Sequence, residues 1–504
     1  MDFPILWPPR DKQVLLKFVV GLLMVTAILK TLAGTTADPD LWGFLAFGRL
    51  FWESGRFPYQ DVFSYVPTLD PWVYHEWLTG VCFYPLYQTL GAPGLQLLKY
   101  GCGLATAGLV YLTARKRGAD PLSAVMVLWM VQLFLAMGYS PVRAQVFTYG
   151  FFALYLYLLE DARLRGHWRG LWFLIPCQVL WCNLHGGFLA GLGLLVLYAL
   201  GEALSRRPFR PYLGALLGSG LATLINPYGM EYWHYILRAV SMPRPEITEW
   251  VSLYRAYQMG FPKEPMGYFL GMAAFSGFLA WWARWREITP ALALAVTLYL
   301  GLKHQRHQVF FLLLAGGYLP VLLTGYFEVL KSRPRALALG HRLGTKIPTL
   351  LVIFLTVLWG YQFLSRAPLS LKIPGVPGTG TKNEIYYPVA ALDYLEKRNL
   401  GGKMLIDFNW GEFAIWTLYP RCRVALDGRY ETVYPDKVSE KYFDFIYGRP
   451  NWRQFLEAYP PDLVLIDIRS TVYPLMTGES QWRQVYADSG CALFLREGVP
   501  APHP

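Results

Sequence analysis

Carboxylates gather in one stretch of this sequence, residues 35–91, which directly follows the first long apolar run. The stretch contains Asp38, Asp40, Asp61, Asp70, His75 and Glu76. Carboxylates held at the edge of a membrane are costly and usually functional, and a carboxylate can take a proton from an attacking group. We therefore predict that Asp38, Asp40 and Glu76 are catalytic.

Cations and imidazoles occupy other short polar segments. Those predicted to bind a donor phosphate are Arg143, Lys303, His304 and Arg306. An acid that faces cations suits transfer from a phosphorylated donor, because the carboxylate removes the acceptor proton while positive groups stabilise the leaving phosphate. A donor that sits in the membrane would be a lipid phosphate. The residues predicted to bind the acceptor or to support the loops are His75, Asn183, His185 and Glu249.

Other roles for these residues stay open at this point. Asp38, Asp40 and Glu76 could together bind a divalent cation, Mg or Mn, since carboxylate oxygens suit these ions. Asp38 could instead cap the short helix predicted over residues 40–52, because Asp is a favoured N-cap residue. The sequence has no Walker loop, dinucleotide fingerprint or Cys/His zinc spacing, so no other cofactor is predicted.

The composition is that of an integral membrane protein. Of 504 residues, 54% are hydrophobic and 16% are charged, against about 25% charged residues in soluble domains. The 19 Trp and 34 Tyr residues suit a chain with many membrane–water interfaces. The net charge of +12 comes from basic clusters in short loops, which orient membrane helices, so nucleic acid is not predicted as a partner.

Eleven apolar runs approach the roughly 20 residues that cross a bilayer. They are residues 14–34, 92–113, 121–139, 143–160, 170–185, 186–204, 211–226, 265–283, 288–303, 308–328 and 346–364. The first run carries Lys17 and Lys30 and exceeds the short core of a signal peptide, so it is interpreted as a membrane helix. We predict a polytopic α-helical membrane domain over residues 1–365, with about eleven transmembrane helices.

Basic residues predict the orientation of these helices. With the N-terminus in the cytoplasm, the loops on that side contain the dense basic clusters, at 115–117, 163–169, 206–210, 284–286 and 331–335. The opposite loops contain the acidic stretch and the other predicted site residues. We therefore predict that the active site lies outside the cytoplasm.

The character of the chain changes after about residue 365. A Pro/Gly-rich linker over 366–383 precedes predicted strands at 403–408, 423–428 and 461–467, a helix at 412–419, and a strand pair near 484–488 and 491–496. This alternation predicts a small α/β domain over residues 384–504, which an odd number of spans places outside the cytoplasm. Cys422 and Cys491 could form a disulfide there, although the sequence fixes neither their distance nor their geometry.

Several motifs resemble those of the GT-C superfamily of membrane glycosyltransferases that use polyprenyl-phosphate sugars. Within it, the similarity is to a poorly characterised bacterial group that resembles mannosyltransferases of lipopolysaccharide and protein. The shared motifs are W-V-Y-H-E-W-L at 72–78, R-A-Q-V-F-T-Y at 143–149, W-C-N-L-H-G-G-F at 181–188, N-P-Y-G at 226–229, I-T-E-W at 247–250 and K-H-Q-R-H at 303–307. L-D-G-R at 426–429 and N-W-G-E-F at 409–413 also fit, and the latter resembles the W-W-D-Y-G motif of oligosaccharyltransferases.

The outer loop carries the resemblance to the catalytic base. In many members it opens with Asp-Glu and reaches an Ala eight residues after the Asp. Asp38 and Ala46 have this spacing, so the resemblance implies that Asp38 is the base. Pro39 replaces the second acidic position and Asp40 follows it, so the motif does not assign Asp40.

The resemblance implies an inverting glycosyltransferase of the bacterial cytoplasmic membrane. Such an enzyme moves a sugar from a polyprenyl phosphate or pyrophosphate to a glycan, lipid or protein acceptor outside the cytoplasm. An oligosaccharyltransferase acting on protein is the alternative enzyme. A transporter or flippase of the lipid-linked sugar, or a non-catalytic scaffold, are the alternatives without chemistry. Transporters place ionisable groups near the bilayer midplane, whereas here these groups gather at one face.

Overall fold

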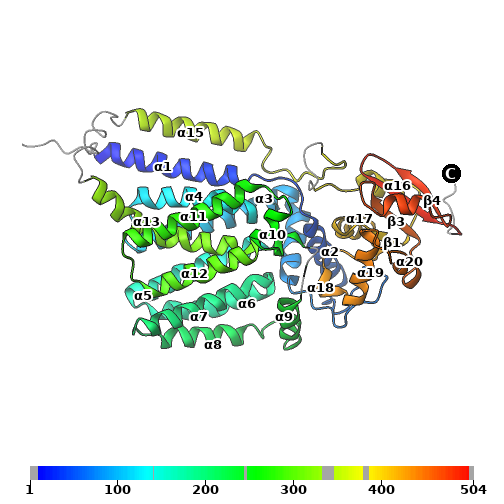
Figure 1. Cartoon of the computed structure of the whole chain (residues 1–504), viewed down its shortest axis with the longest axis horizontal. Helices are drawn as coiled ribbons and strands as arrows, with labels where there is room; N and C mark the ends of the chain where they lie inside the picture. Colours follow the sequence, from blue (N-terminus) through cyan, green and yellow to red (C-terminus); the bar gives the residue numbers. More distant parts are fainter. Residues whose placement is uncertain are drawn as a thin grey trace, which may run out of the picture.

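Long helices lie side by side over the first part of the chain, and a small α/β domain follows at one end of them (Figure 1). The computed structural model describes residues 10–139, 141–242, 244, 247–331, 346–378 and 385–498. Residues 379–384, at the predicted junction of linker and α/β domain, and 332–335 of the last basic cluster lie outside this description.

A helix covers most of each of the eleven predicted apolar runs. These helices are α1 (Arg10–Thr31), α3 (Trp77–Lys116), α4 (Pro121–Tyr139), α5 (Gln145–Arg165), α6 (Leu174–Leu184), α7 (Leu189–Leu204), α8 (Arg210–Ala222), α11 (Lys263–Trp282), α12 (Ile288–Lys303), α13 (Gln308–Lys331) and α15 (Lys346–Leu364). Three more helices lie between the runs, namely α2 (Pro39–Ser54), α9 (Glu231–Ser241) and α10 (Leu253–Gln258). Short 3-10 segments precede α6, α7, α10 and α13, namely η1 (Trp168–Phe173), η2 (Gly186–Phe188), η3 (Thr248–Trp250) and η4 (Gln305–His307).

Three helical segments of the described chain are long and apolar enough to cross a membrane. They are Trp77–Lys116, Gly186–Leu204 and Gln305–Leu330. Shorter apolar helices cover Phe18–Thr31, Pro121–Gln132, Ile288–Lys303 and Leu350–Leu364. Because α6 and α8 have only 11 and 13 residues, short of the roughly 20 that span a bilayer, the predicted count of about eleven transmembrane helices is not confirmed.

Helix α3 begins earlier than the sequence indicates. The apolar pattern predicts a helix over 92–113 and an acidic loop that ends at residue 91, but α3 already starts at Trp77. Gly91 has a φ of 61° and Pro93 follows it, so the helix kinks here instead of ending. The connection between α2 and α3 is therefore shorter than the predicted loop.

Helix α2 starts directly after Asp38, which caps it. The Asp38 carboxylate accepts a hydrogen bond from the Asp40 backbone N–H (3.1 Å), and Pro39 occupies the first turn. The helix predicted over 40–52 is therefore confirmed. Residues 41–48 are all buried, because α2 lies between α3 and helix α17 (Gly411–Leu418) of the α/β domain.

Two glycines let the backbones of α2 and α3 touch. A Cβ on Gly48 would lie 2.2 Å from the carbonyl oxygen of Gly80, and a Cβ on Gly80 would lie 2.7 Å from the carbonyl oxygen of Phe44. Any larger side chain would push the two helices apart. The position of α2, and with it that of Asp40, is thus fixed by contact with the bundle.

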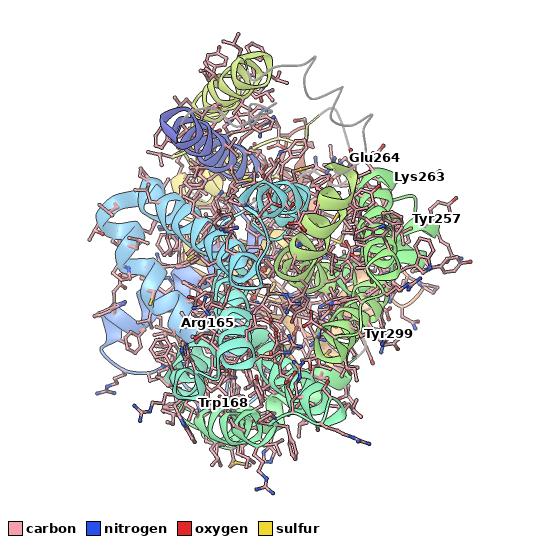
Figure 2. All side chains as sticks on the ribbon, turned by 90° about the vertical axis from the view of Figure 1, so that its left-hand side faces the viewer. Arg165, Trp168, Tyr257, Lys263, Glu264 and Tyr299 are labelled. Carbon is pink, nitrogen blue, oxygen red and sulfur yellow. The ribbon has the colours of Figure 1, made fainter. Side chains whose placement is uncertain are left out.

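A buried polar cluster lies at the other end of the bundle. Arg163 on α5 pairs with Glu202 on α7 (2.8 Å) and with Glu287, just before α12 (2.7 Å). Arg117, just after α3, also pairs with Glu287 (2.7 Å). Figure 2 faces this end of the bundle, where Arg165 marks the last turn of α5. The ion pairs join four helices and so anchor the end of α5 that is remote from the α/β domain.

The α/β domain is built on a five-stranded sheet. Its elements are α16 (Val389–Lys397), β1 (Gly402–Ile406), η5 (Phe408–Trp410), α17, β2 (Cys422–Val424), α18 (Tyr430–Val433), α19 (Asp436–Ile446), α20 (Arg453–Ala458), β3 (Leu463–Asp467), α21 (Tyr473–Thr477), β4 (Trp482–Ala487) and β5 (Cys491–Arg496). The strand order is β2-β1-β3-β5-β4. Strand β1 runs parallel to β2 and β3, whereas β5 is antiparallel to β3 and β4. The predicted α/β character is confirmed.

The α/β domain packs on the end of the bundle that carries Asp38. The Tyr387 hydroxyl donates to the carbonyl oxygen of Ala37 (2.9 Å). Ser64, between α2 and α3, forms a β-bridge with Val424 of β2, and the nearby Asp61 pairs with Arg429. The acidic stretch is therefore part of the junction between the two parts of the chain.

Cys422 and Cys491 are both free and buried. They lie on β2 and β5, which β1 and β3 separate in the sheet. Strands in a sheet are roughly 5 Å apart, so three strand spacings alone put the two cysteines at least about 14 Å from each other, beyond the roughly 7 Å that a disulfide tolerates between Cα atoms. The disulfide that the sequence leaves open is therefore not formed.

Candidate active site

A large cavity lies between the bundle and the α/β domain. Its volume is about 1310 Å³, which exceeds the roughly 300–1,000 Å³ of a site for one small molecule. Its charged lining residues are Asp38, Asp40, Glu76, Arg143, Arg244, Glu249, Lys303, Arg306, Asp407, Glu412, Arg429, Glu431, Asp467 and Arg469. Every predicted site residue except Asn183 lines it, so the fold brings the polar segments together.

Arg143 holds three acids of the cavity together. Its Nη2 donates to Asp40 (2.7 Å), its Nη1 donates to Glu249 (2.6 Å), and its Nε lies 3.3 Å from Asp38 Oδ1. Burial would raise the pKa of Glu249, but Arg143 and Arg306 outweigh it and lower this pKa. The sequence predicts a phosphate-binding role for Arg143, whereas in the structure three carboxylates already occupy its guanidinium.

The two carboxylates of the D-P-D segment differ in exposure. The Asp38 side chain is 6% exposed and caps α2, whereas the Asp40 side chain is 36% exposed in the cavity. Burial raises the pKa of Asp38 to about 7, although Arg143 opposes this effect, and burial also raises the pKa of Asp40. Asp40 is therefore the more accessible of the two acids to a substrate in the cavity.

Glu76 is paired with two histidines. Its Oε1 lies 3.4 Å from His75 Nε2 and 3.3 Å from His185 Nε2. The Gly187 N–H donates to His185 Nδ1 (2.9 Å), which leaves the proton of a neutral His185 on Nε2, facing Glu76. Burial would raise the pKa of Glu76, but the histidines lower it to about 2. These contacts keep Glu76 ionised and brace the start of α3 against the connection between α6 and α7.

Cations surround Trp250, the residue that follows Glu249. The guanidinium of Arg306 stacks on the Trp250 ring at 4.6 Å from its centroid, and that of Arg244 at 4.7 Å. His304 Nδ1 donates to the Trp250 carbonyl oxygen (2.6 Å). Within the described ranges, Arg306 and the exposed Lys303 are the cavity cations without a carboxylate inside 4 Å, which fits the phosphate-binding role predicted for them.

Asn183 lies outside the cavity. Its Oδ1 accepts a hydrogen bond from Trp77 Nε1 (2.7 Å), and its Nδ2 donates to the carbonyl oxygens of Val179 (2.7 Å) and Ile225 (2.9 Å). The side chain therefore ties α3, α6 and the segment after α8 together. The sequence predicts that Asn183 either binds the acceptor or supports the loops, and these contacts agree with the supporting role.

The acids do not fit the divalent cation that the sequence allows. Asp38 and Asp40 face the guanidinium of Arg143, and Glu76 faces two imidazoles. In the part of the chain that the structure describes, no group of three or more His, Cys, Asp or Glu side chains could hold a metal ion. This geometry therefore gives no support to a Mg or Mn site made by the three acids.

Helix α17 adds an acid that reasoning from the sequence misses. Glu412 is buried and accepts a hydrogen bond from the Gly43 N–H of α2 (3.0 Å). A Cβ on Gly428 would lie 2.9 Å from Glu412 Oε1 and 3.2 Å from Asp40 Oδ1, so the two acids are neighbours. Burial, together with Asp40 and Asp427, raises the pKa of Glu412 well above its usual range. The N-W-G-E-F motif contains this residue, but only the fold brings it to Asp40.

Two more acids line the α/β side of the cavity. Asp407 directly follows β1, and Asp467 ends β3. Each stands at the end of an apolar run, which is a signal for a strand end in the sequence. The sequence does not show that the two strands are neighbours, so it does not bring these acids together.

The bundle side of the cavity is apolar. Helices α7 and α12 contact each other here and contribute Leu189, Ala190, Leu194, Val196, Leu197, Val296 and Leu300 to the lining. Val196 is also among the exposed apolar residues. The cavity therefore has an apolar end in the bundle, charged residues in the middle and a polar end in the α/β domain.

Comparison with known proteins places the fold. No family model matches the sequence, and none of the curated proteins compared with it matches. Among solved structures, the chain is similar to the oligosaccharyltransferase of Archaeoglobus fulgidus in its apo form, with a TM-score of 0.55 and 11% identity over 96% of this chain and 75% of that chain. The complex of the same archaeal protein with Zn and sulfate gives a TM-score of 0.46 and 13% identity over 89% of this chain and 68% of that chain.

The apo structure defines the fold class of this protein. The likeness extends over nearly the whole chain, so the helical bundle and the α/β domain together share the fold of that archaeal protein. This likeness in fold agrees with the resemblance that the motifs indicate. Membership of the mannosyltransferase-like bacterial group stays a prediction.

Proposed function

We propose that this protein is an inverting glycosyltransferase of the bacterial cytoplasmic membrane, with a polyprenyl phosphate or pyrophosphate sugar as donor. The observation that carries the proposal is the order of groups along one cavity. An apolar wall on α7 and α12 suits a lipid chain, Arg306 and Lys303 suit its phosphate, and Asp40 lies on the acidic side. The fold shared with the archaeal oligosaccharyltransferase is compatible with this reaction.

In the proposed reaction, an acceptor hydroxyl attacks C1 of the donor sugar. The new O–C1 bond forms as the bond from C1 to the phosphate oxygen breaks, and its electron pair passes to the phosphate. Asp40 takes the hydroxyl proton. Arg306 and Lys303 stabilise the charge that develops on the phosphate. Attack opposite the leaving group inverts C1.

Asp40 replaces Asp38 as the base in this proposal. The sequence motif assigns the role to Asp38, but that side chain is buried and caps α2. Asp38 and Glu249 instead hold Arg143, which positions Asp40. Glu412, a neighbour of Asp40, accepts a hydrogen bond from the Gly43 backbone N–H and so helps to fix α2, the helix that carries the proposed base.

The test follows the tritium label of a polyprenyl-phosphate sugar. Purified protein in detergent receives a panel of such donors with neutral oligosaccharides and Asn-, Ser- and Thr-containing peptides as acceptors. We expect label to move from the lipid phase to the aqueous phase. Asp40→Asn should lower this rate by on the order of 10²-fold or more while the donor still co-purifies. Asp38→Asn should lose less, and full activity in Asp40→Asn would refute the proposal.

A second candidate is an oligosaccharyltransferase, which the shared fold favours. It differs in its substrates, since only donors with a preassembled glycan would react and only peptides would accept. A transporter would instead move the label across a proteoliposome membrane with the lipid–sugar bond intact. The Asp40→Asn variant should then transport the label as well as the wild type does. The same donor panel therefore separates the three functions.

We also propose that the cavity faces the outside of the cytoplasm, which the basic clusters support. The test labels single cysteines in intact cells, in a Cys82→Ser background because Cys82 is exposed. Lys437→Cys, on the surface of α19, should react from outside. Arg165→Cys, at the other end of the bundle, should react only after permeabilisation, and the reverse pattern would overturn the orientation.

A further inference from the structure

The α/β end of the cavity lies at a topological switch point of the sheet. Strand β1 has β2 on one side and β3 on the other, and all three run parallel. The chain thus leaves β1 towards β2 on one side and returns to β3 on the other. In open α/β sheets, ligands bind in the crevice outside the carboxyl ends of the strands at such a point. Asp407 and Asp467 stand there, and both line the cavity.

The acid after β1 has hydrogen-bonding capacity left. Among the described residues, the Asp407 carboxylate accepts one hydrogen bond, from the Asn409 N–H (3.1 Å), although a carboxylate offers about four acceptor positions. Asp467, in contrast, pairs with Arg469 through two guanidinium nitrogens (3.1 and 3.0 Å). The crevice therefore presents one carboxylate with spare acceptor positions beside an ion pair that is already neutral.

Aromatic side chains form the rest of this wall. Tyr447 is 42% exposed and stacks on Phe443, with ring centroids 5.9 Å apart and an interplanar angle of 15°. Phe408 and Tyr430 pack on the same Phe443, and all four rings line the cavity. The wall thus combines flat apolar faces with acceptors for hydrogen bonds.

These groups select for a neutral polyhydroxyl ligand. Hydroxyl groups can donate to Asp407, and the C–H face of a sugar ring can pack on Tyr447 or Phe408. An anionic ligand would meet Asp407, and the arginines that could compensate are paired, Arg469 with Asp467 and Arg429 with Asp427. A lipid chain suits the other end of the cavity, where α7 and α12 supply the apolar wall.

We propose that this strand-end crevice, made by Asp407, Phe408, Asn409 and Tyr447, binds a neutral saccharide. That this saccharide is the acceptor rests on the proposed transferase function, whereas its binding does not. Residue 412 follows Asn409 by one turn, so the same N-W-G-E-F segment leads from the crevice to Glu412 and Asp40. A saccharide held in the crevice would thus extend towards the proposed base.

The test measures binding without donor. Fluorescently labelled full-length protein in detergent is applied to an array of neutral and acidic oligosaccharides and of Asn-, Ser- and Thr-containing peptides, and the dissociation constant of the best neutral saccharide is then titrated. Tyr447→Ala and Asp407→Asn should each weaken this binding by tenfold or more. Asp393→Asn, an exposed acid on α16, and Arg306→Ala, at the donor end, should leave it within twofold.

Three results would overturn the proposal. They are no retention on any neutral saccharide, retention that Tyr447→Ala and Asp407→Asn leave unchanged, and retention on peptides that these variants abolish. If Asp407→Asn does not fold, Tyr447→Ala keeps the test valid, because Tyr447 lies at the surface. Failure of the transferase proposal looks different, since saccharide binding would then persist in a protein that transfers no label.

Discussion

Gly48→Ala tests whether contact between α2 and α3 positions the proposed base. The new Cβ would lie 2.2 Å from the Gly80 carbonyl oxygen and 2.5 Å from Tyr84 Cβ, whereas ordinary contact begins at 3.4 Å. The helices must therefore separate by roughly 1 Å, because the opposing oxygen belongs to backbone. Overpacking of this kind costs about 1–3 kcal/mol of stability.

The displacement reaches Asp40 along the helix. Asp40 stands eight residues before Gly48, about 12 Å away at 1.5 Å per residue, so the substitution touches no group of the cavity. A misplacement of about 1 Å can cost on the order of 10²-fold in rate. We therefore expect Gly48→Ala to fold and bind donor but to transfer sugar about 10²-fold more slowly. The assay is the tritium-transfer rate of purified protein, with donor co-purification and thermal unfolding measured on the same sample.

Two matched glycines complete the experiment. A Cβ on Gly101, which is also on α3, would have no atom of the described residues within 4 Å, so Gly101→Ala should keep the wild-type rate and gain up to about 1 kcal/mol of stability. Gly80→Ala, with its closest contact at 2.7 Å, should fall between the two. A wild-type rate in Gly48→Ala, or equal losses in Gly48→Ala and Gly101→Ala, would refute the reasoning.

Three further predictions concern other parts of the molecule. Arg306→Ala should weaken donor co-purification and lower the transfer rate together, and Arg306→Lys should recover part of both; normal donor retention in Arg306→Ala would contradict its role. Burial, with Asp467 beside it, raises the pKa of Asp407 to about 6. Saccharide affinity should therefore fall as the pH drops from 7.5 to 5, whereas the affinity of Asp407→Asn should not change with pH. An equal decline in both proteins would show that Asp407 is not the group that titrates. Arg163→Ala leaves the buried Glu202 without the guanidinium that it pairs with, so the free energy of unfolding should fall by about 3–5 kcal/mol. The transfer rate per folded molecule should stay unchanged, and an unaltered melting temperature would contradict this prediction.

The elements of this fold follow from local patterns. Apolar runs of helical length predict the helices, and alternating short runs predict the strands of the α/β domain, because burial of apolar side chains drives both. The capping of α2 by Asp38 is also readable, since Asp followed by Pro is a helix-start signal. The kink in α3 is harder to predict, because Gly91 and Pro93 are typical of a helix end when the packing around them is unknown.

The candidate site is predictable in part. The polar segments that form the cavity stand out because charges are rare in this chain. The pairs that these residues form cannot be predicted from the sequence. Arg143 could equally bind a phosphate or pair with three acids, because the segments that meet in the fold are about one hundred residues apart in the chain. Asp407 and Asp467 need the strand order, and Glu412 needs the packing of α17 on α2. Long-range pairing is the information that local sequence patterns lack.

The position of α2 between α3 and α17 has a consequence for biosynthesis. Gly43 and Glu412, which meet across this contact, are 369 residues apart in the chain. At about 5–20 residues per second, roughly 20–70 seconds pass between their syntheses. During that interval α2 has its bundle partner but lacks the helix that covers its other side. A nascent chain therefore stays incomplete at the site until α17 has been synthesised.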